Sequence, residues 1–244
     1  MSNNLFDFPA SCFVEQRIAK ALFADNGPLT PADRRTFKNE IEEAVCAYVL
    51  KPDNVFLNPW SDGEHEYDSL AVIEISLRKT GKAERIAELF HRTMPYPLLL
   101  MLHDSEANIM FSMAEKRISR DGREQVVLER TVNTPWQPES ALSEFIVEAD
   151  FAKFRKTTFR DLYLHYMNLL EALCAAAVIG ELRTDGIDPD ARRKTLAQLH
   201  SLDLELSSIR AKAKQETELP DLVELNLKAK TIKLQIEQTI RSLS

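Results

Sequence analysis

Two apolar heptad patterns near the C-terminal end constrain the fold of this 244-residue chain more than any other feature. Apolar residues recur there at steps of three and four, which places one apolar seam on each of two helices. Pro220 separates the two patterns, and proline is favoured in the first turn of a helix. The sequence therefore predicts an antiparallel coiled-coil hairpin over about residues 190–244. The alternative is that both helices are ordinary surface helices.

The seam of this hairpin is also the predicted partner-binding site, because an apolar helical stripe is a common recognition surface. Self-association and binding of another protein are both open for it. The predicted partner-binding residues are Leu199, Leu202, Leu206, Ile209, Leu222, Leu225, Ile232 and Ile236.

The middle of the chain changes from a helical period to the alternation of β-strands. Residues 70–77 alternate most clearly, a helix is expected over 83–92, and further apolar strands follow at 98–102, 109–113 and 125–130. A strand, a helix and then hairpin-connected strands are typical of a mixed sheet backed by helices. We place this sheet within residues 48–136.

The N-terminal segment predicts two helices within residues 11–49. Val14 and Ile18 start a helical spacing, and Thr30 with Asp33 forms a capping signal for a second helix that continues through Ile41 and Tyr48. The predicted fold class is α+β: N-terminal helices and a mixed β-sheet in a domain of residues 1–150, followed by a helical region of residues 151–244 that ends in the hairpin.

Composition and charge exclude several classes of protein. A formal net charge of −7 argues against a protein that coats nucleic acid or an anionic membrane through bulk charge. The three cysteines are far apart and form no CxxC pair, which favours free thiols in a reducing compartment. The N-terminus lacks a signal-peptide pattern, and the longest apolar stretch, residues 170–179, is too short to span a membrane. We expect a cytoplasmic protein without membrane contact.

No complete catalytic motif is present, so a non-catalytic protein without cofactor or metal is favoured. The five histidines form no zinc-binding spacing, and the chain lacks the motifs of serine hydrolases and nucleotide-binding loops. One alternative is a Mg-dependent nuclease that uses Asp68, Glu74 and Lys79. Ser76 occupies the position where that scheme needs lysine, and the competing interpretation is a solvated sheet face.

Two basic groups are candidates for nucleic-acid contact. Arg17 and Lys20 are one helical turn apart in the predicted first helix, and Lys116 and Arg117 lie between two predicted strands. Lysine and arginine at such places can neutralise phosphates, and the contact would be nonspecific and salt-sensitive. A solvated hairpin tip is the alternative for the second pair.

Short motifs along almost the whole chain resemble one bacterial family, known as domain of unknown function 4391. Their order carries the resemblance, since each motif is short. The motifs are Phe6–Pro9, Arg17–Lys20 before Leu22-Phe23, Ala47-Tyr48 with Leu50–Pro52, the strand end Ile73–Ile75, Met94–Tyr96, Lys116, Thr134–Trp136 and Val223–Asn226. The chain departs from the family pattern at Ala19, where proline is common, and has longer polar loops around residues 61–66.

The resemblance implies a role without implying an activity. Family members tend to be encoded beside helicases and DNA methyltransferases in restriction-like or phage-defence clusters. We therefore expect a non-catalytic interaction or scaffold subunit of such a complex, with a helicase or DNA methyltransferase as protein partner. The nuclease is the alternative, and direct contact with DNA stays open.

Overall fold

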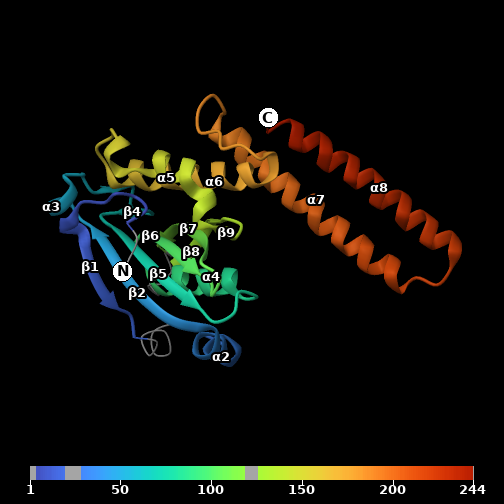
Figure 1. Ribbon diagram of the computed structural model, residues 1–244, viewed down its shortest axis with the longest axis horizontal. Coiled ribbons are helices and arrows are strands. Elements are labelled where there is room, and N and C mark those ends of the chain that lie inside the picture. Colours follow the sequence, from blue (N-terminus) through green and yellow to red (C-terminus); the bar gives the residue numbers. More distant parts are fainter. Residues whose placement is uncertain (1–3, 20–28, 119–125, 244) are drawn as a thin grey trace. The chain divides into compact units, whose positions relative to one another are not determined.

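A computed structural model describes residues 4–19, 29–118 and 126–243 of the chain (Figure 1). The chain divides into two compact units, residues 1–170 and residues 171–244. The protein is α+β, as predicted. The first unit contains a mixed β-sheet between helices, and the second unit is helical.

The sheet of the first unit has the strand order β1-β2-β5-β6-β7-β8, with β9 paired to β7. Its strands are β1 (Phe13–Arg17), β2 (Ile41–Leu50), β5 (Leu70–Leu77), β6 (Leu98–His103), β7 (Asn108–Ile118), β8 (Val126–Asn133) and β9 (Gln137–Pro138). All pairs are antiparallel except β5 and β6. Parallel neighbours need a crossover, which α4 (Ala83–Thr93) supplies. The short strands β3 (Trp60–Ser61) and β4 (Glu66–Tyr67) form a separate hairpin.

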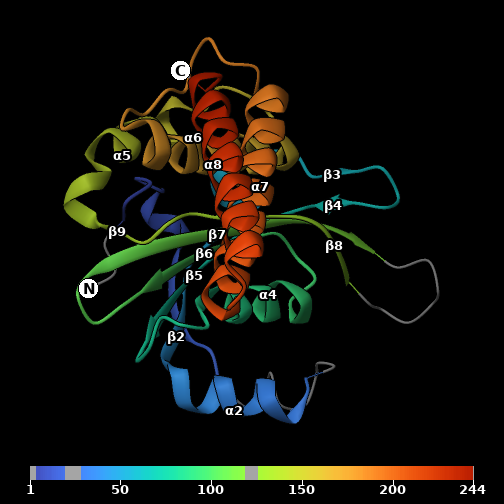
Figure 2. The ribbon, with the colours of Figure 1, turned by 90° about the vertical axis from the view of Figure 1, so that its right-hand side faces the viewer.

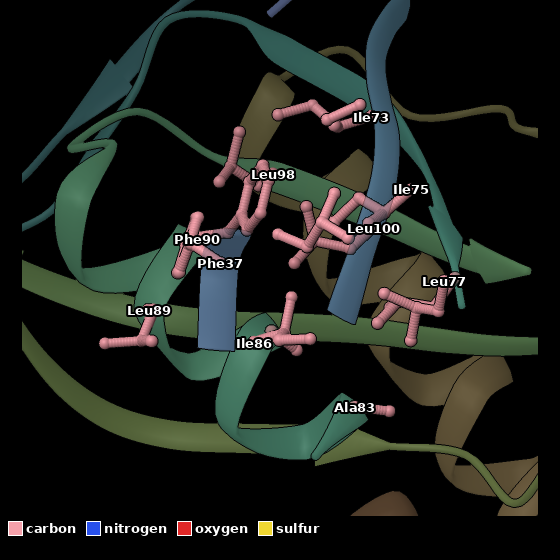
Figure 3. Packing of buried hydrophobic residues seen from close by; sticks show 14 of the residues in the cluster. Phe37, Ile73, Ile75, Leu77, Ala83, Ile86, Leu89, Phe90, Leu98 and Leu100 are labelled. Carbon is pink, nitrogen blue, oxygen red and sulfur yellow. The ribbon is translucent and has the colours of Figure 1, made fainter. Parts of the chain in front are cut away.

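Helices α2 (Pro31–Glu40) and α4 cover one face of the sheet. The rings of Phe37 and Phe90 stack with centroids 5.6 Å apart, and Ile86 is fully buried. Figure 3 shows the apolar side chains of α4 beside those of β5 and β6, among them Ile75 and Leu100. The predicted strand at residues 70–77 is confirmed, because it is the central strand of this core.

Helix α6 (Phe159–Ile179) lies on the opposite face, near α5 (Ser143–Ala149). The Tyr163 hydroxyl donates to the carbonyl oxygen of Ala114 at 2.7 Å and accepts from its N–H at 3.0 Å. Phe6 packs against Tyr166 from the N-terminal segment. We expected no segment of membrane-spanning length, yet this 21-residue helix meets that criterion by length and composition. Its Tyr163 and Tyr166 side chains are buried, as in a core helix.

The second unit contains the end of α6 and two long helices, α7 (Pro189–Gln215) and α8 (Leu219–Arg241). Three residues connect α7 and α8, which run side by side in opposite directions (Figures 1 and 2). Leu206, Ile209 and Ile232 form a buried cluster between them. The two helices and their shared apolar seam are therefore observed, whereas the supercoiled geometry of a coiled coil stays a prediction.

The predicted helices within residues 11–49 are partly wrong. The segment around Val14 is the edge strand β1, and the helix capped by Thr30 ends at Glu40, after which residues 41–50 form β2. Register shifts in β2 between Ile41 and Glu43, and between Cys46 and Tyr48, explain the error. Such bulges add a residue to one strand and break its alternation. Buried residues of β2 therefore recur at steps of three, as in a helix.

The boundary between the units also differs from the predicted boundary near residue 150. The units divide after Leu170, within α6. The first part of α6 belongs to the sheet unit because Leu162, Tyr163 and Tyr166 are buried in its core. Pro52–Val55 form the short helix α3, and three single 3-10 turns at residues 10–12, 139–142 and 151–153 complete the described elements.

Candidate functional site

The structure does not bring the three predicted nuclease residues together. Asp68 is exposed before the start of β5, Glu74 lies within β5, and Lys79 is exposed beyond its end. β5 extends from Leu70 to Leu77 and rises about 3.3 Å per residue, so Glu74 lies about 13 Å from one strand end and about 10 Å from the other. Asp68 and Lys79 each lie two residues beyond those ends. Within residues 4–19, 29–118 and 126–243, no group of three or more His, Cys, Asp or Glu side chains is arranged to hold a metal ion.

The surroundings of Glu74 are those of a partly buried sheet face. Its cross-strand partners are Val45 on β2 and Met101 on β6. Burial lowers the pKa of His103, and the Glu74 carboxylate opposes that shift. Glu139 and Asp104 act on His103 in the same direction as Glu74, so three carboxylates lie in the electrostatic surroundings of this imidazole.

Of the predicted basic groups, Arg17, Lys116 and Arg117 contact other residues of the chain, and Arg17 remains largely exposed. Arg17 Nε lies 3.3 Å from Glu43 Oε1, and Arg17 is on a strand rather than on the predicted helix. Arg117 Nε lies 3.1 Å from Glu129 Oε1. The other member of the first pair, Lys20, lies outside the described residues.

Lys116 has a structural role. Its Nζ donates to the carbonyl oxygens of Met94 and Tyr96, each at 2.8 Å, and so holds the loop that precedes β6. Burial lowers the pKa of Lys116 well below its ordinary value. The ammonium group is directed into the protein, which removes it from a phosphate-binding surface.

A histidine bridge joins the loop between β3 and β4 to strand β8. His65 Nδ1 lies 3.0 Å from Asp62 Oδ2, and His65 Nε2 lies 2.9 Å from Glu129 Oε2. The hydrogen bond to Glu129, followed by that to Asp62, raises the pKa of His65. The sequence predicted only a solvated turn at residues 61–66. Glu129 is 64 residues away along the chain, so no local signal indicated the bridge.

Six of the eight predicted partner-binding residues belong to the apolar cluster between α7 and α8: Leu202, Leu206, Ile209, Leu225, Ile232 and Ile236. Leu199 belongs to a second cluster, with Ala175 and Leu243. Leu199, Leu206, Ile209 and Ile232 are buried. The other four are Leu202, Leu222, Leu225 and Ile236, and they are half-buried. Most of these residues therefore pack the two helices of the hairpin against each other, and their role in binding a partner stays a prediction.

A second apolar stripe lies on the outer side of α8. Leu219, Val223, Leu227 and Leu234 are 71%, 50%, 61% and 51% exposed. At about 100° per residue their spacing places all four within roughly 80° of the helix circumference. The seam residues of α8 are centred on nearly the opposite side. We call these four residues the outer face of α8. The spacing of these four residues could be seen in the sequence, but the heptad pattern of the seam residues was more regular and was interpreted first.

Charge is distributed unevenly along α8. Asp221 and Glu224 lie in its first part, Lys228, Lys230 and Lys233 follow, and Glu237 and Arg241 lie near its end. Glu224 and Lys228 form an ion pair one turn apart. At about 100° per residue, Lys230, Glu237 and Arg241 share the sector of the outer face, whereas Asp221 lies towards the seam. Apolar stripes of this size, flanked by charge, are typical of surfaces that bind proteins.

Comparison with known families covers both units. Residues 6–236 match the model of a family described as "Domain of unknown function (DUF4391)". The match confirms the resemblance that the ordered motifs indicated. Comparison with curated proteins and with solved structures found no match.

Proposed function

This chain belongs to the DUF4391 family, and we propose that it is a non-catalytic interaction subunit of a bacterial restriction-like or phage-defence complex. Its expected partner is a helicase or a DNA methyltransferase, and its expected location is the cytoplasm. The class of partner comes from the resemblance to the family. The role in assembly is supported by the surface of the hairpin.

The outer face of α8 is the observation that carries this proposal. Four large apolar side chains on one side of one helix remain at least half exposed, from Leu219 to Leu234. Water contact with such a stripe is unfavourable by about 25 cal/mol for each Å² that a partner could cover. The seam on the other side already stabilises the hairpin. The outer face therefore serves assembly rather than folding.

The sheet unit supports the same proposal through the arrangement of its polar groups. Glu74 lies within β5, whereas Asp68 and Lys79 lie before and beyond the two ends of that strand. Lys116 and Arg117 contact other groups of the protein. Catalysis needs groups that converge on one reacting atom. The described part of the sheet unit is therefore better suited to act as a scaffold.

Affinity purification of the tagged full chain from its bacterial host tests the proposal. We expect a helicase or DNA methyltransferase to co-purify with the parent chain and with Leu204→Glu, and to be lost with Leu227→Glu. Leu204 is 59% exposed on α7 and lies outside the outer face of α8, so it is the matched control. Recovery of the same enzyme with Leu227→Glu, or of no DNA-processing enzyme with the parent chain, contradicts the proposal.

The nuclease alternative has a separate test. Because its three residues do not converge, the purified chain is expected to leave plasmid DNA intact during long incubation with Mg²⁺. Cleavage that Glu74→Ala abolishes, measured on agarose gels against the unchanged parent chain, would replace the interaction proposal with the nuclease.

A further inference from the structure

The outer face of α8 has a gap that a second copy of the same helix can fill. Between Leu227 and Leu234 the face continues through Lys230 and Thr231, which are not apolar. Consider an antiparallel pair of α8 helices centred on Leu227. Each residue of one helix then faces the residue of the other helix that lies the same number of positions on the opposite side of Leu227. Val223 then lies opposite Thr231, and Leu227 lies opposite its own copy.

The ends of the stripe also match in this arrangement. Leu219 is eight residues before Leu227, and Leu234 is seven residues after it. Each Leu219 therefore comes beside Leu234 of the other helix. The combined stripe is apolar at both ends and in the middle, and Val223 covers the level at which the other helix carries Lys230 and Thr231. The apolar stripe of one helix is interrupted at Lys230 and Thr231. Two antiparallel stripes together form an apolar contact without that interruption.

One pair of charges fits the same orientation. Glu224 and Lys230 lie three residues on either side of Leu227. An antiparallel pair brings each Glu224 to the level of Lys230 on the other helix. A parallel pair in register would place acid beside acid and lysine beside lysine, which is unfavourable.

We propose that the outer face of α8 binds the same face of a second copy of this chain, with the two helices antiparallel about a twofold axis through Leu227. This inference rests on the proposed function and refines it: the dimer formed through the outer face of α8, and not the single chain, is the form that captures the helicase or DNA methyltransferase. A twofold interface uses the same patch on both copies. On α7, Leu204 is the one large apolar side chain that is strongly exposed, so α8 supplies the interface.

The mass of the purified full chain in solution tests the pairing. By sedimentation equilibrium we expect about twice the 27.9 kDa chain mass. Leu227→Glu places two carboxylates at the twofold axis and should weaken dimerisation by about 30-fold or more, as expected for a central interface residue. Leu204→Glu should remain dimeric. Circular dichroism checks that Leu227→Glu stays folded, which is expected because Leu227 is 61% exposed.

Disulfide cross-linking tests the orientation. Leu227→Cys should cross-link to its own copy under mild oxidation. Leu219→Cys should not cross-link alone, but should do so when mixed with Leu234→Cys. The parent chain, whose Cys12 is buried and whose other two cysteines are half-buried, sets the background. Efficient cross-linking of Leu219→Cys to itself indicates a parallel pair and overturns the antiparallel arrangement.

The outcomes separate this inference from the proposed function. A chain that is monomeric in isolation, but that captures a helicase or methyltransferase in a manner lost with Leu227→Glu, overturns self-pairing and leaves the function standing. A dimer that Leu227→Glu dissociates, but that captures no DNA-processing enzyme, supports self-pairing and contradicts the function. A dimer that Leu227→Glu leaves intact overturns self-pairing.

Discussion

At the scale of single residues, several polar side chains make contacts that stabilise the fold rather than form a binding or catalytic site. His65 is the clearest example of a residue whose contacts depend on protonation. Each of its ring nitrogens faces a carboxylate, Asp62 on one side and Glu129 on the other. Only the protonated imidazolium has a donor on both nitrogens. The bridge between the β3–β4 loop and β8 is therefore complete only when His65 is charged.

This geometry predicts a pH-dependent contribution to stability. Because the folded pKa of His65 is raised above its ordinary value near 6.5, the contribution is fully present below that value and is lost as pH rises through the folded pKa. His65→Ala should reduce the free energy of unfolding by about 0.5 kcal/mol at pH 5.5, as for a partly exposed ion pair, and by less at pH 9. Urea denaturation of both chains at both pH values measures it. An equal loss at pH 5.5 and pH 9 would show that protonation of His65 is not involved.

Lys116 leads to a second prediction at this scale. Lys116→Met removes the two hydrogen bonds to the carbonyl oxygens of Met94 and Tyr96. Leaving such groups without a partner costs about 1–3 kcal/mol of stability. Arg117→Gln, which removes only an ion pair at the surface, should cost less than about 1 kcal/mol. Chemical denaturation compares the two variants. A Lys116→Met chain that is fully stable but binds DNA less tightly would restore Lys116 as a phosphate contact.

At the scale of elements, the sequence predicted structure well where one period dominates a segment. The strand at residues 70–77 and the helix from Ala83 are central core elements, and their patterns are regular. The end of α2 could not be predicted in this way. Two bulges in β2 place Ile41, Ala44 and Ala47 in the buried set at a helical spacing. Register depends on the partner strand, which local sequence does not reveal.

The candidate sites show the same limit. The heptad pattern predicted the hairpin and its seam residues, but left open whether the seam also binds a partner. The outer face of α8 has the spacing of a helix stripe, yet its importance depends on the exposure of Leu219 and Leu227. His65 and Glu129 meet only through the tertiary fold. The sequence predicted which residues share one face of a helix or strand. It could not predict which residues from distant parts of the chain pack against that face.

The seam of the hairpin gives a prediction with an internal control. Leu206→Ala removes a side chain that is buried between α7 and α8, so it should lower the free energy of unfolding of the second unit by about 2–4 kcal/mol. Leu204→Ala changes the same residue type two positions away on the exposed side of α7 and should have little effect. Denaturation followed by circular dichroism at 222 nm measures both. Similar losses for the two variants would mean that the seam does not stabilise the hairpin.

At the scale of the whole molecule, the two units have different kinds of core. The first unit depends on strand pairs between distant parts of the chain, as between β2 and β5, whereas the second unit depends on helices that are neighbours in sequence. Among the described residues, the apolar cluster between α4 and the sheet has no residue in common with the two clusters of the second unit. We therefore expect the second unit to unfold without the first, because cooperative units with separate cores can open separately.

The two tryptophans make that expectation measurable, since Trp60 and Trp136 are both in the first unit. Ile209→Asp puts a charge without a partner into the seam, and so should shift the loss of helical signal at 222 nm to lower denaturant while the tryptophan fluorescence transition stays in place. Ile86→Ala, in the core of the sheet unit, should instead move the fluorescence transition. If Ile209→Asp moves both signals together, then the continuous helix α6 couples the two units into one folding unit, and the assembly surface on α8 is as stable as the sheet itself.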